Sequence, residues 1–176
     1  MLVRNDTSYL SDIFAKFNVL NLALQGNEVN LIKVKSAMPG FKNKLVIYQR
    51  NLARRDFLQF SSLQQLDTHS DCVISNADID AHSKHLLELQ ADMEVRFQDV
   101  FQLEVPDWII DPFGDITSEH GMIEEELVTL QSDIELKAKF RISHQSFWLQ
   151  NDIKERYPHA WDRVNLFLLH FPAFTW

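Results

Sequence analysis

His82 and His85 are the residues whose type and spacing come closest to a metal-binding pattern. They lie three positions apart on a predicted helix and therefore share one helical face, with Asp78 one turn earlier. The thiolate candidate, Cys72, belongs to the preceding loop. A structural zinc site needs four ligands that close around the ion, and this set is incomplete. We therefore expect no metal and no other cofactor, and we interpret the two histidines as packed or surface residues beside acids.

Patterns for other kinds of catalysis are weaker. Glu124, Glu125 and Glu126 are successive residues, so they point around a helix and cannot flank one bond together. Cys72 has no nucleophile motif around it, and no serine lies in a nucleophile elbow. The four glycines stand alone at positions 26, 40, 114 and 121, so no phosphate-binding loop is present. The sequence predicts that the chain is not an enzyme.

A basic segment, residues 33–55, contains seven Lys and Arg and no acid. Residues 56–135 carry 19 acids against two bases, and the whole chain has a formal net charge of −8. A block of this kind is either a footprint for a polyanion or a charged face that is solvated or paired within the fold, and we favour the second interpretation. The candidate nucleic-acid contacts are Lys33, Lys35, Lys42, Lys44, Arg50, Arg54 and Arg55.

The elements that must position these residues are predicted to be helices. The 176 residues are 45% hydrophobic, enough for one sizeable domain or two very small ones, and only 4 Gly and 5 Pro are present. A single cysteine cannot form an internal disulfide, which favours a reducing, intracellular compartment. No apolar run reaches the ~18 residues of a membrane span, and the amino terminus does not resemble a secretory signal. The expected fold class is mostly α.

Apolar spacing predicts a helix over residues 8–25 with Gly26 just past its end. A second helix is expected from Asn27 onward, with a kink or break near residues 38–40 because Pro39 removes a backbone donor. The apolar positions of the first helix face are Leu10, Ile13, Phe14, Phe17, Leu20 and Leu24.

Beyond Arg55 the pattern weakens into a loop or short helical turns, and Asp78 is the expected N-cap of a helix that ends near Gln102. Two prolines favour an ordered extended connector over residues 103–114, and helical spacing resumes over 119–140. A short helix capped by Ser143 or Ser146 follows. Pro158 then opens the last helix, in which we expect burial of Trp161, Val164, Phe167 and Leu168.

Several short motifs occur in an order that resembles hAT-superfamily transposase-derived proteins of vertebrates, a group with BED zinc-finger, SCAN-domain and general transcription factor II-I repeat relatives. The run LNLALQGN (residues 20–27) resembles the family's LNLxLQG segment, and ELVTLQSD (126–133) resembles ELIxLQSD. The other matches, in the same order along nearly the whole chain, are FKNKL (41–45), RFQD (96–99), DPF (111–113), Leu136-Lys137 with Phe140, Phe147-Trp148 and Tyr157-Pro158.

The resemblance implies the helical insertion domain of a hAT-type transposase with an incomplete RNase H-like or dimerisation end. Residues 1–142 would be the insertion-like region, and residues 143–176 the start of a truncated hAT dimerisation region. The family's catalytic residues are two aspartates on early strands and a glutamate beyond the insertion, which hold divalent metal. The early strands are absent from this sequence, and the glutamate would follow the part that matches residues 171–176. Pro39-Gly40 also departs from the family pattern.

The leading hypothesis is a non-catalytic, transposase-derived, domesticated helical module for self-association or protein interaction, with a homo-oligomer or a related transposase-derived protein as partner. The alternative is a sequence-independent nucleic-acid contact through residues 33–55, and an active transposase or nuclease is the least favoured. No membrane partner is expected, and the resemblance implies a nuclear location. The interface candidates are the large aromatic residues Trp148, Tyr157, Trp161, Phe167 and Phe171.

Overall fold

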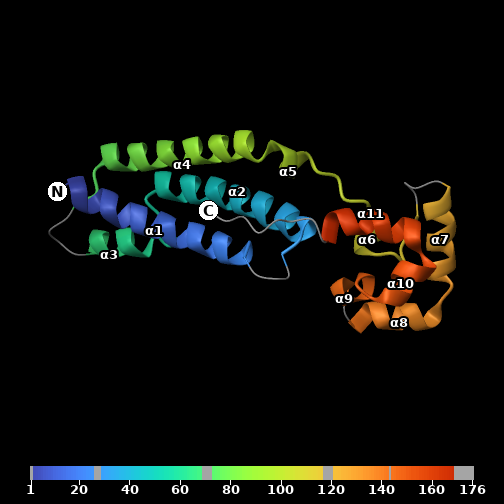
Figure 1. Cartoon of the computed structure of the whole chain (residues 1–176). Helices are drawn as coiled ribbons and strands as arrows, with labels where there is room; N and C mark the ends of the chain where they lie inside the picture. The colour runs from blue at the N-terminus through green and yellow to red at the C-terminus, as the bar shows by residue number, and fades with distance from the viewer. Residues whose placement is uncertain (1, 26–28, 69–72, 117–120, 143, 169–176) are drawn as a thin grey trace. The chain divides into compact units, whose positions relative to one another are not determined.

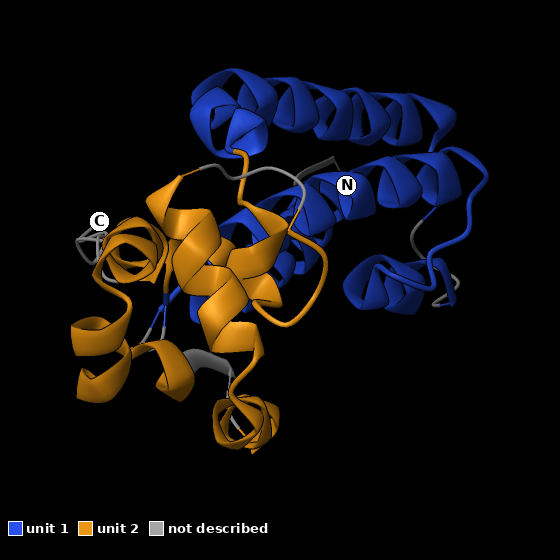
Figure 2. Ribbon diagram, turned by 90° about the vertical axis from the view of Figure 1, so that its right-hand side faces the viewer, with its two compact units in different colours: residues 1–29, 33–103 blue, residues 30–32, 104–176 orange. Residues whose placement is uncertain are grey.

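Helices make up the regular structure of the chain, as the apolar spacing predicts. The computed structural model describes residues 2–25, 29–68, 73–116, 121–142 and 144–168, and no strand occurs within these ranges. The mostly α fold class is therefore confirmed. Contacts divide the chain into two units, coloured separately in Figure 2: unit 1 comprises residues 1–29 and 33–103, and unit 2 comprises residues 30–32 and 104–176.

Unit 1 is built on three long helices, α1 (Leu2–Ala23), α2 (Leu31–Ala53) and α4 (Asn76–Arg96). They lie alongside one another, with α2 antiparallel to the other two (Figure 1). The short helix α3 (Ser61–Thr68) packs against α1, and α5 (Gln98–Gln102) continues from α4. Among the side chains that fill the space between these helices are Tyr9, Ile13, Leu45, Leu52, Phe60, Leu63 and Leu86, each no more than 3% exposed.

Helix α1 forms where the sequence predicts a helix, but it begins earlier, at Leu2, and its buried face is rotated from the expected one. Ile13 is buried, whereas Leu10 and Phe14 are 40% and 68% exposed. The reason is that Tyr9 and Asp12 turn toward the other helices of the unit, which moves Phe14 outward. The predicted apolar face of this helix is therefore only partly covered, with Ile13 buried and Phe14 exposed.

Helix α2 passes through Pro39 without the break that the sequence predicts. Proline at this position costs one backbone hydrogen bond of the helix. Met38 and Phe41, on either side of the Pro39-Gly40 pair, are both buried, so packing of this face holds the helix together across the missing bond. Helical continuity is decided here by tertiary contacts rather than by local propensity.

Two expectations about α3 and α4 also change. The weak pattern after Arg55 contains an eight-residue helix, α3, and Asp78 is not the N-cap of α4. Ser75 is the N-cap, and its hydroxyl accepts from the backbone N–H of Asp78 while the Asp78 carboxylate accepts from the backbone N–H of Ser75, which is a capping box. Phe97, with a non-helical backbone, separates α4 from α5 before Gln102 is reached.

Unit 2 consists of shorter helices around an aromatic core. They are α6 (Asp107–Ile110), α7 (Met122–Gln131), α8 (Ile134–Ile142), α9 (His144–Trp148), α10 (Asn151–Arg156) and α11 (Pro158–Leu168). Trp108 and Trp148 meet edge to face with ring centroids 6.0 Å apart, and Phe147 lies 5.2 Å from Trp148 in the same geometry. Edge-to-face pairs of this kind add to the energy of apolar burial, so the rings are the centre of the unit.

Helix α11 begins at Pro158 as predicted. Its Val164 and Phe167 are buried as expected, while Trp161 and Leu168 are only half-buried. The predicted helix over 119–140 is divided, because the Asp133 carboxylate accepts from the backbone N–H groups of Glu135 and Leu136 and so starts α8.

The connector over 103–114 contains the single turn α6, which buries Trp108, so it is ordered against the core but not fully extended. The expected short helix after residue 143 is two helices, α9 and α10, and Ser143 lies outside the described residues. The expected boundary between residues 142 and 143 separates two regions of a transposase that the resemblance implies. The division between residues 103 and 104 instead separates two units by their internal contacts, so it does not test that boundary. The expected boundary therefore stays a prediction.

No helix within the described ranges is both long enough and apolar enough to cross a membrane.

Candidate functional site

The basic segment is divided by α2 into an inward and an outward set. The Lys35 ammonium donates to the backbone carbonyl of Phe101, and Lys42 pairs with Glu94 while its ammonium lies 4.5 Å from the centroid of the Phe101 ring. Both lysines therefore tie α2 to α4 and α5.

Arg55 belongs to the same inward set. It follows the last residues of α2 with a left-handed backbone, φ 59°, where glycine is the usual choice. Its guanidinium donates to the carbonyl of Ile74 and to the side chain of Asn76 at the start of α4. The side-chain contacts offset the backbone strain, which explains an arginine at this position.

The outward set carries the cations that a polyanion could reach. Lys44, Arg50 and Arg54 are exposed and make no hydrogen bond or ion pair with any described residue, and Lys33 is also exposed. No acid occurs in α2, so this face has a single sign of charge. The outward set therefore contains four cations of the predicted nucleic-acid set, but Lys44 and Arg50, six positions apart, lie about 120° apart around the helix axis.

The aromatic interface candidates lie mostly inside unit 2. Trp148 and Tyr157 are each 2% exposed, and Phe167 is 7% exposed. The Trp148 indole donates to the carbonyl of Ile109, and the half-buried Trp161 donates to the carbonyl of Trp148. These side chains are brought together, but by the core of the unit. Phe171 lies outside the described residues.

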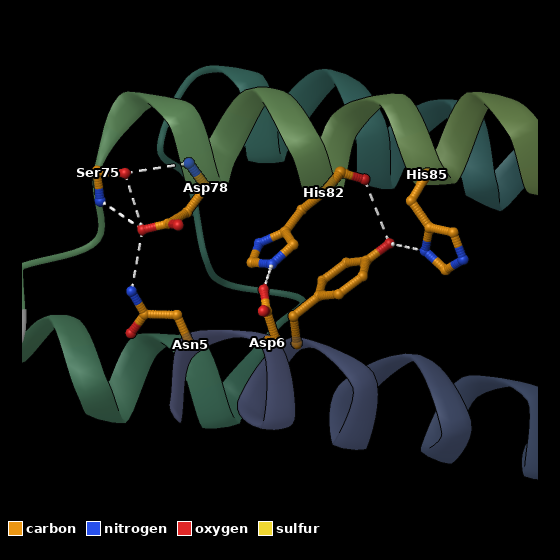
Figure 3. A network of polar contacts seen from close by, with 7 residues as sticks. Asn5, Asp6, Ser75, Asp78, His82 and His85 are labelled. Carbon is orange, nitrogen blue, oxygen red and sulfur yellow. Dashed lines mark hydrogen bonds and ion pairs between the residues drawn. The ribbon is translucent and has the colours of Figure 1, made fainter. Parts of the chain in front are cut away.

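The two histidines belong to a polar network between α1 and α4 (Figure 3). His82 is 4% exposed, its Nε2 is 3.0 Å from the Asp6 carboxylate, and its ring stacks on Tyr9 with centroids 4.1 Å apart. The Tyr9 hydroxyl lies 2.8 Å from Nδ1 of His85. Burial raises the pKa of Tyr9, so its hydroxyl remains protonated at neutral pH.

Asp78 joins the same network from the first turn of α4 (Figure 3). Its carboxylate accepts from Nδ2 of Asn5 at 3.0 Å and from both the backbone N–H and the hydroxyl of Ser75 at 2.9 Å. The backbone hydrogen bond from Ser75, helped by the two side-chain donors, outweighs burial and holds the pKa of Asp78 below its usual value. Asp78 therefore stays ionised and satisfied in the helix interface.

Asp12 is a second buried carboxylate, and it caps a neighbouring helix. It accepts from the backbone N–H groups of Ser62 and Leu63 and from the Ser61 hydroxyl, at 3.0 to 3.2 Å. Lys16, one turn further along α1, donates to the carbonyl of Gln59, and burial lowers its pKa. Neither contact follows from sequence spacing, since the partners are more than 40 positions apart.

Within the described ranges, no three His, Cys, Asp or Glu side chains are grouped so that they could hold a metal ion. The interpretation of His82 as a packed histidine is confirmed by its burial. The roles of Asn5, Asp6 and Tyr9 could not be predicted from the sequence, because their partners lie more than 70 positions away. The Ser75-x-x-Asp78 capping box, by contrast, could have been found from its spacing.

The described residues form two all-helical units that carry charged and apolar side chains on their exposed helix faces. No known family model and no solved structure matches the chain. The chain is similar to general transcription factor II-I repeat domain-containing protein 2 of Bos taurus, with 23% identity over 168 residues. The match covers 94% of this chain and 16% of the relative, so the chain spans about one sixth of that protein's length.

Proposed function

We propose that this chain is a non-catalytic helical module, derived from a hAT-type transposase, that acts through self-association or through binding another protein. The observation that carries the proposal is the similarity to the bovine relative across 94% of the chain, although it covers only 16% of that protein. The ordered motifs from LNLALQGN to Tyr157-Pro158 support a transposase origin. The transcription factor in the relative's name supports a nuclear location.

Self-association is tested by the solution mass of the purified chain, measured by size-exclusion chromatography with light scattering at low and moderate salt. We expect a single dimer near twice 20.6 kDa at both salts. A compact monomer at every concentration would contradict self-association, and a binding partner would then have to be a different protein.

The aromatic candidates give this proposal a second test. Trp161 is half-buried and Phe167 is nearly fully buried in α11. If these residues, rather than a surface of unit 1, anchor the interface, Trp161→Ala should raise the dimer dissociation constant, because the Trp161 ring is less enclosed than that of Phe167 and is available to a partner. Loss of stability with the dimer intact would assign Trp161 to the core of unit 2.

The alternative function is a sequence-independent nucleic-acid contact through the outward face of α2. Lys44 and Arg50 are exposed on this helix, which contains no acid, and Arg54 is exposed just beyond its last residue, Ala53. Their exposure supports this alternative for part of the segment only. The net charge of −8 opposes tight binding.

Fluorescence anisotropy with a labelled 20-nucleotide duplex tests the alternative. Reversal of these three cations to glutamate should abolish binding, while the wild type should lose affinity steeply between 50 and 200 mM salt. The matched control reverses the exposed cations Lys84, Lys139 and Arg163, which gives the same change of net charge elsewhere. Equal loss in both triple variants would show that only total charge matters.

An active transposase or nuclease remains the least favoured function. It would require metal-binding carboxylates from another chain. Metal-dependent strand cleavage by the purified chain alone would overturn this ranking.

A further inference from the structure

From Thr7 to Ala23 the exposed side chains of α1 carry no charge, unlike those of the other long helices. The exposed Asp6, one turn before Leu10, pairs with His82 of α4. From Thr7 to Gln25 the charged residues are Asp12 and Lys16, and both turn inward to α3 and the segment before it. By contrast, the outward face of α2 carries Lys44 and Arg50, and that of α4 carries acids and bases along its whole length.

The exposed surface of α1 carries large apolar side chains. Phe14 is 68% exposed, Val19 66%, Leu22 61% and Leu10 40%. Single exposed apolar residues are common on protein surfaces, but a group of them on one uncharged helix face is typical of an interaction site. The remaining exposed positions include the uncharged hydrogen-bonding residues Thr7, Ser11, Asn18, Asn21 and Gln25.

Four of these residues form one ridge. Leu10, Phe14, Asn18 and Leu22 are spaced by four positions, and this is the row that interdigitates in the commonest class of helix packing, with helices crossing at about −50°. Helix α1 has 22 residues and is about 33 Å long, so it can present the whole ridge to a second helix.

We propose that this ridge is the surface by which a second copy of the chain docks, α1 against α1, about a two-fold axis near Phe14 and Asn18. The proposal rests on the proposed self-association and specifies its surface. In a two-fold interface the same patch meets itself, so every charge on the patch would face its own sign. An uncharged ridge avoids this repulsion, whereas the outward face of α2 would oppose its own bases. A nucleic acid or an anionic membrane would need cations on the ridge, and none is present.

The first experiment measures the dimer dissociation constant of the full chain by analytical ultracentrifugation for the wild type and for Phe14→Glu. We expect the substitution to raise this constant by about thirtyfold or more, because it places two carboxylates at the two-fold axis. Val95→Glu is the matched control: Val95 is 77% exposed on α4, so the same change there should leave the constant within about threefold. Circular dichroism must show equal helix content in both variants.

A charge-swap mixture then tests whether the ridge meets itself. Phe14→Glu and Phe14→Lys should each be monomeric alone and should form a heterodimer when mixed, because opposite charges then face each other. As a second test, Asn18→Cys in a Cys72→Ser background should form a disulfide-linked dimer under mild oxidation. Leu87→Cys on α4, 50% exposed, is the control that should remain monomeric on a non-reducing gel.

The outcomes separate this inference from the proposed function. A wild-type dimer that survives Phe14→Glu, or a mixture that stays monomeric, would overturn the α1 interface while leaving self-association intact. A wild type that is monomeric at all concentrations would overturn both.

Discussion

The helices of the two units are held together by different kinds of contact. Unit 1 joins long helices through buried polar networks, in which Asp78, His82 and Asp12 each have a partner on a distant element. Unit 2 gathers short helices around aromatic rings, with Trp108 and Trp148 at the centre. Unit 1 has 11 Lys and Arg against 12 Asp and Glu, whereas unit 2 has 6 against 13.

The largest expected loss of stability comes from a substitution in the aromatic core of unit 2. Trp148→Ala removes a ring that is 2% exposed and leaves the carbonyl of Ile109 without its indole donor, so unit 2 should lose about 3–5 kcal/mol of stability. Urea unfolding followed by tryptophan fluorescence measures this loss, because all four tryptophans belong to residues 104–176. Leu149→Ala, at a neighbouring position that is 48% exposed, is the control. A loss below about 1 kcal/mol for Trp148→Ala would contradict the aromatic core.

The corresponding destabilising substitution in unit 1 is Asp12→Ala. It removes the acceptor for the backbone N–H groups of Ser62 and Leu63 and should cost about 2 kcal/mol. Amide hydrogen exchange should show faster exchange at these two positions. Asp80→Ala, an exposed acid on α4, should leave their exchange unchanged. Unchanged protection in Asp12→Ala would mean that α3 is held by packing alone.

A pH titration sharpens the contrast between the units. The folded-state pKa of Asp78 is lowered, so its contribution to stability is present above the unfolded value of about 3.9 and is lost as pH falls through the folded-state pKa. Asp78→Asn should lower the stability of unit 1 by about 1 kcal/mol at pH 7 and flatten the acid limb of its curve. The measurement is urea unfolding by far-UV circular dichroism from pH 2 to 7. An acid limb identical to that of the wild type would contradict the role of Asp78.

The smallest expected effect is a stabilisation. A Cβ at Gly40 would meet no atom within 4 Å, and this residue lies in a continuous helix, so Gly40→Ala should stabilise unit 1 by about 0.5–1 kcal/mol. Thermal unfolding by circular dichroism measures the gain. Gly121→Ala, at a residue with φ 74°, is the contrasting variant and should destabilise unit 2. A destabilising Gly40→Ala would show that α2 needs the freedom of glycine next to Pro39.

Local signals in the sequence were enough to place most helices but not their faces. Pro158 starts α11 because its preset backbone and missing donor suit a first turn, and this part of the prediction is confirmed. Phe14 and Ile13 both belong to the predicted apolar face of α1, yet only Ile13 is buried, because tertiary packing decides which edge of an apolar stripe is covered. Pro39 shows the opposite error, since burial on both sides overrides a local breaking signal.

The polar sites were the least predictable part. The Ser75-x-x-Asp78 capping box is local and therefore readable, whereas the contact of Asn5 with Asp78 joins residues 73 positions apart. The seven bases of residues 33–55 left two interpretations open, a footprint for a polyanion and a face that is solvated or paired within the fold. Lys35, Lys42 and Arg55 have partners inside unit 1, which agrees with the second interpretation for these three cations. The orientation of each cation depends on which helix lies next to α2, and a single sequence does not contain that arrangement.

Because different cations of the basic segment serve each purpose, the packing contacts of this segment and its surface charge can be altered separately by mutation. Lys35, Lys42 and Arg55 each contact a partner inside unit 1, so a substitution at any of these positions removes that contact and lowers the stability of the unit. Lys44, Arg50 and Arg54 carry no such constraint within the described residues and can change sign over generations while the scaffold persists. A protein engineer can therefore randomise the outward positions as a library and use unit 1 as a display scaffold whose surface charge is chosen independently of its fold.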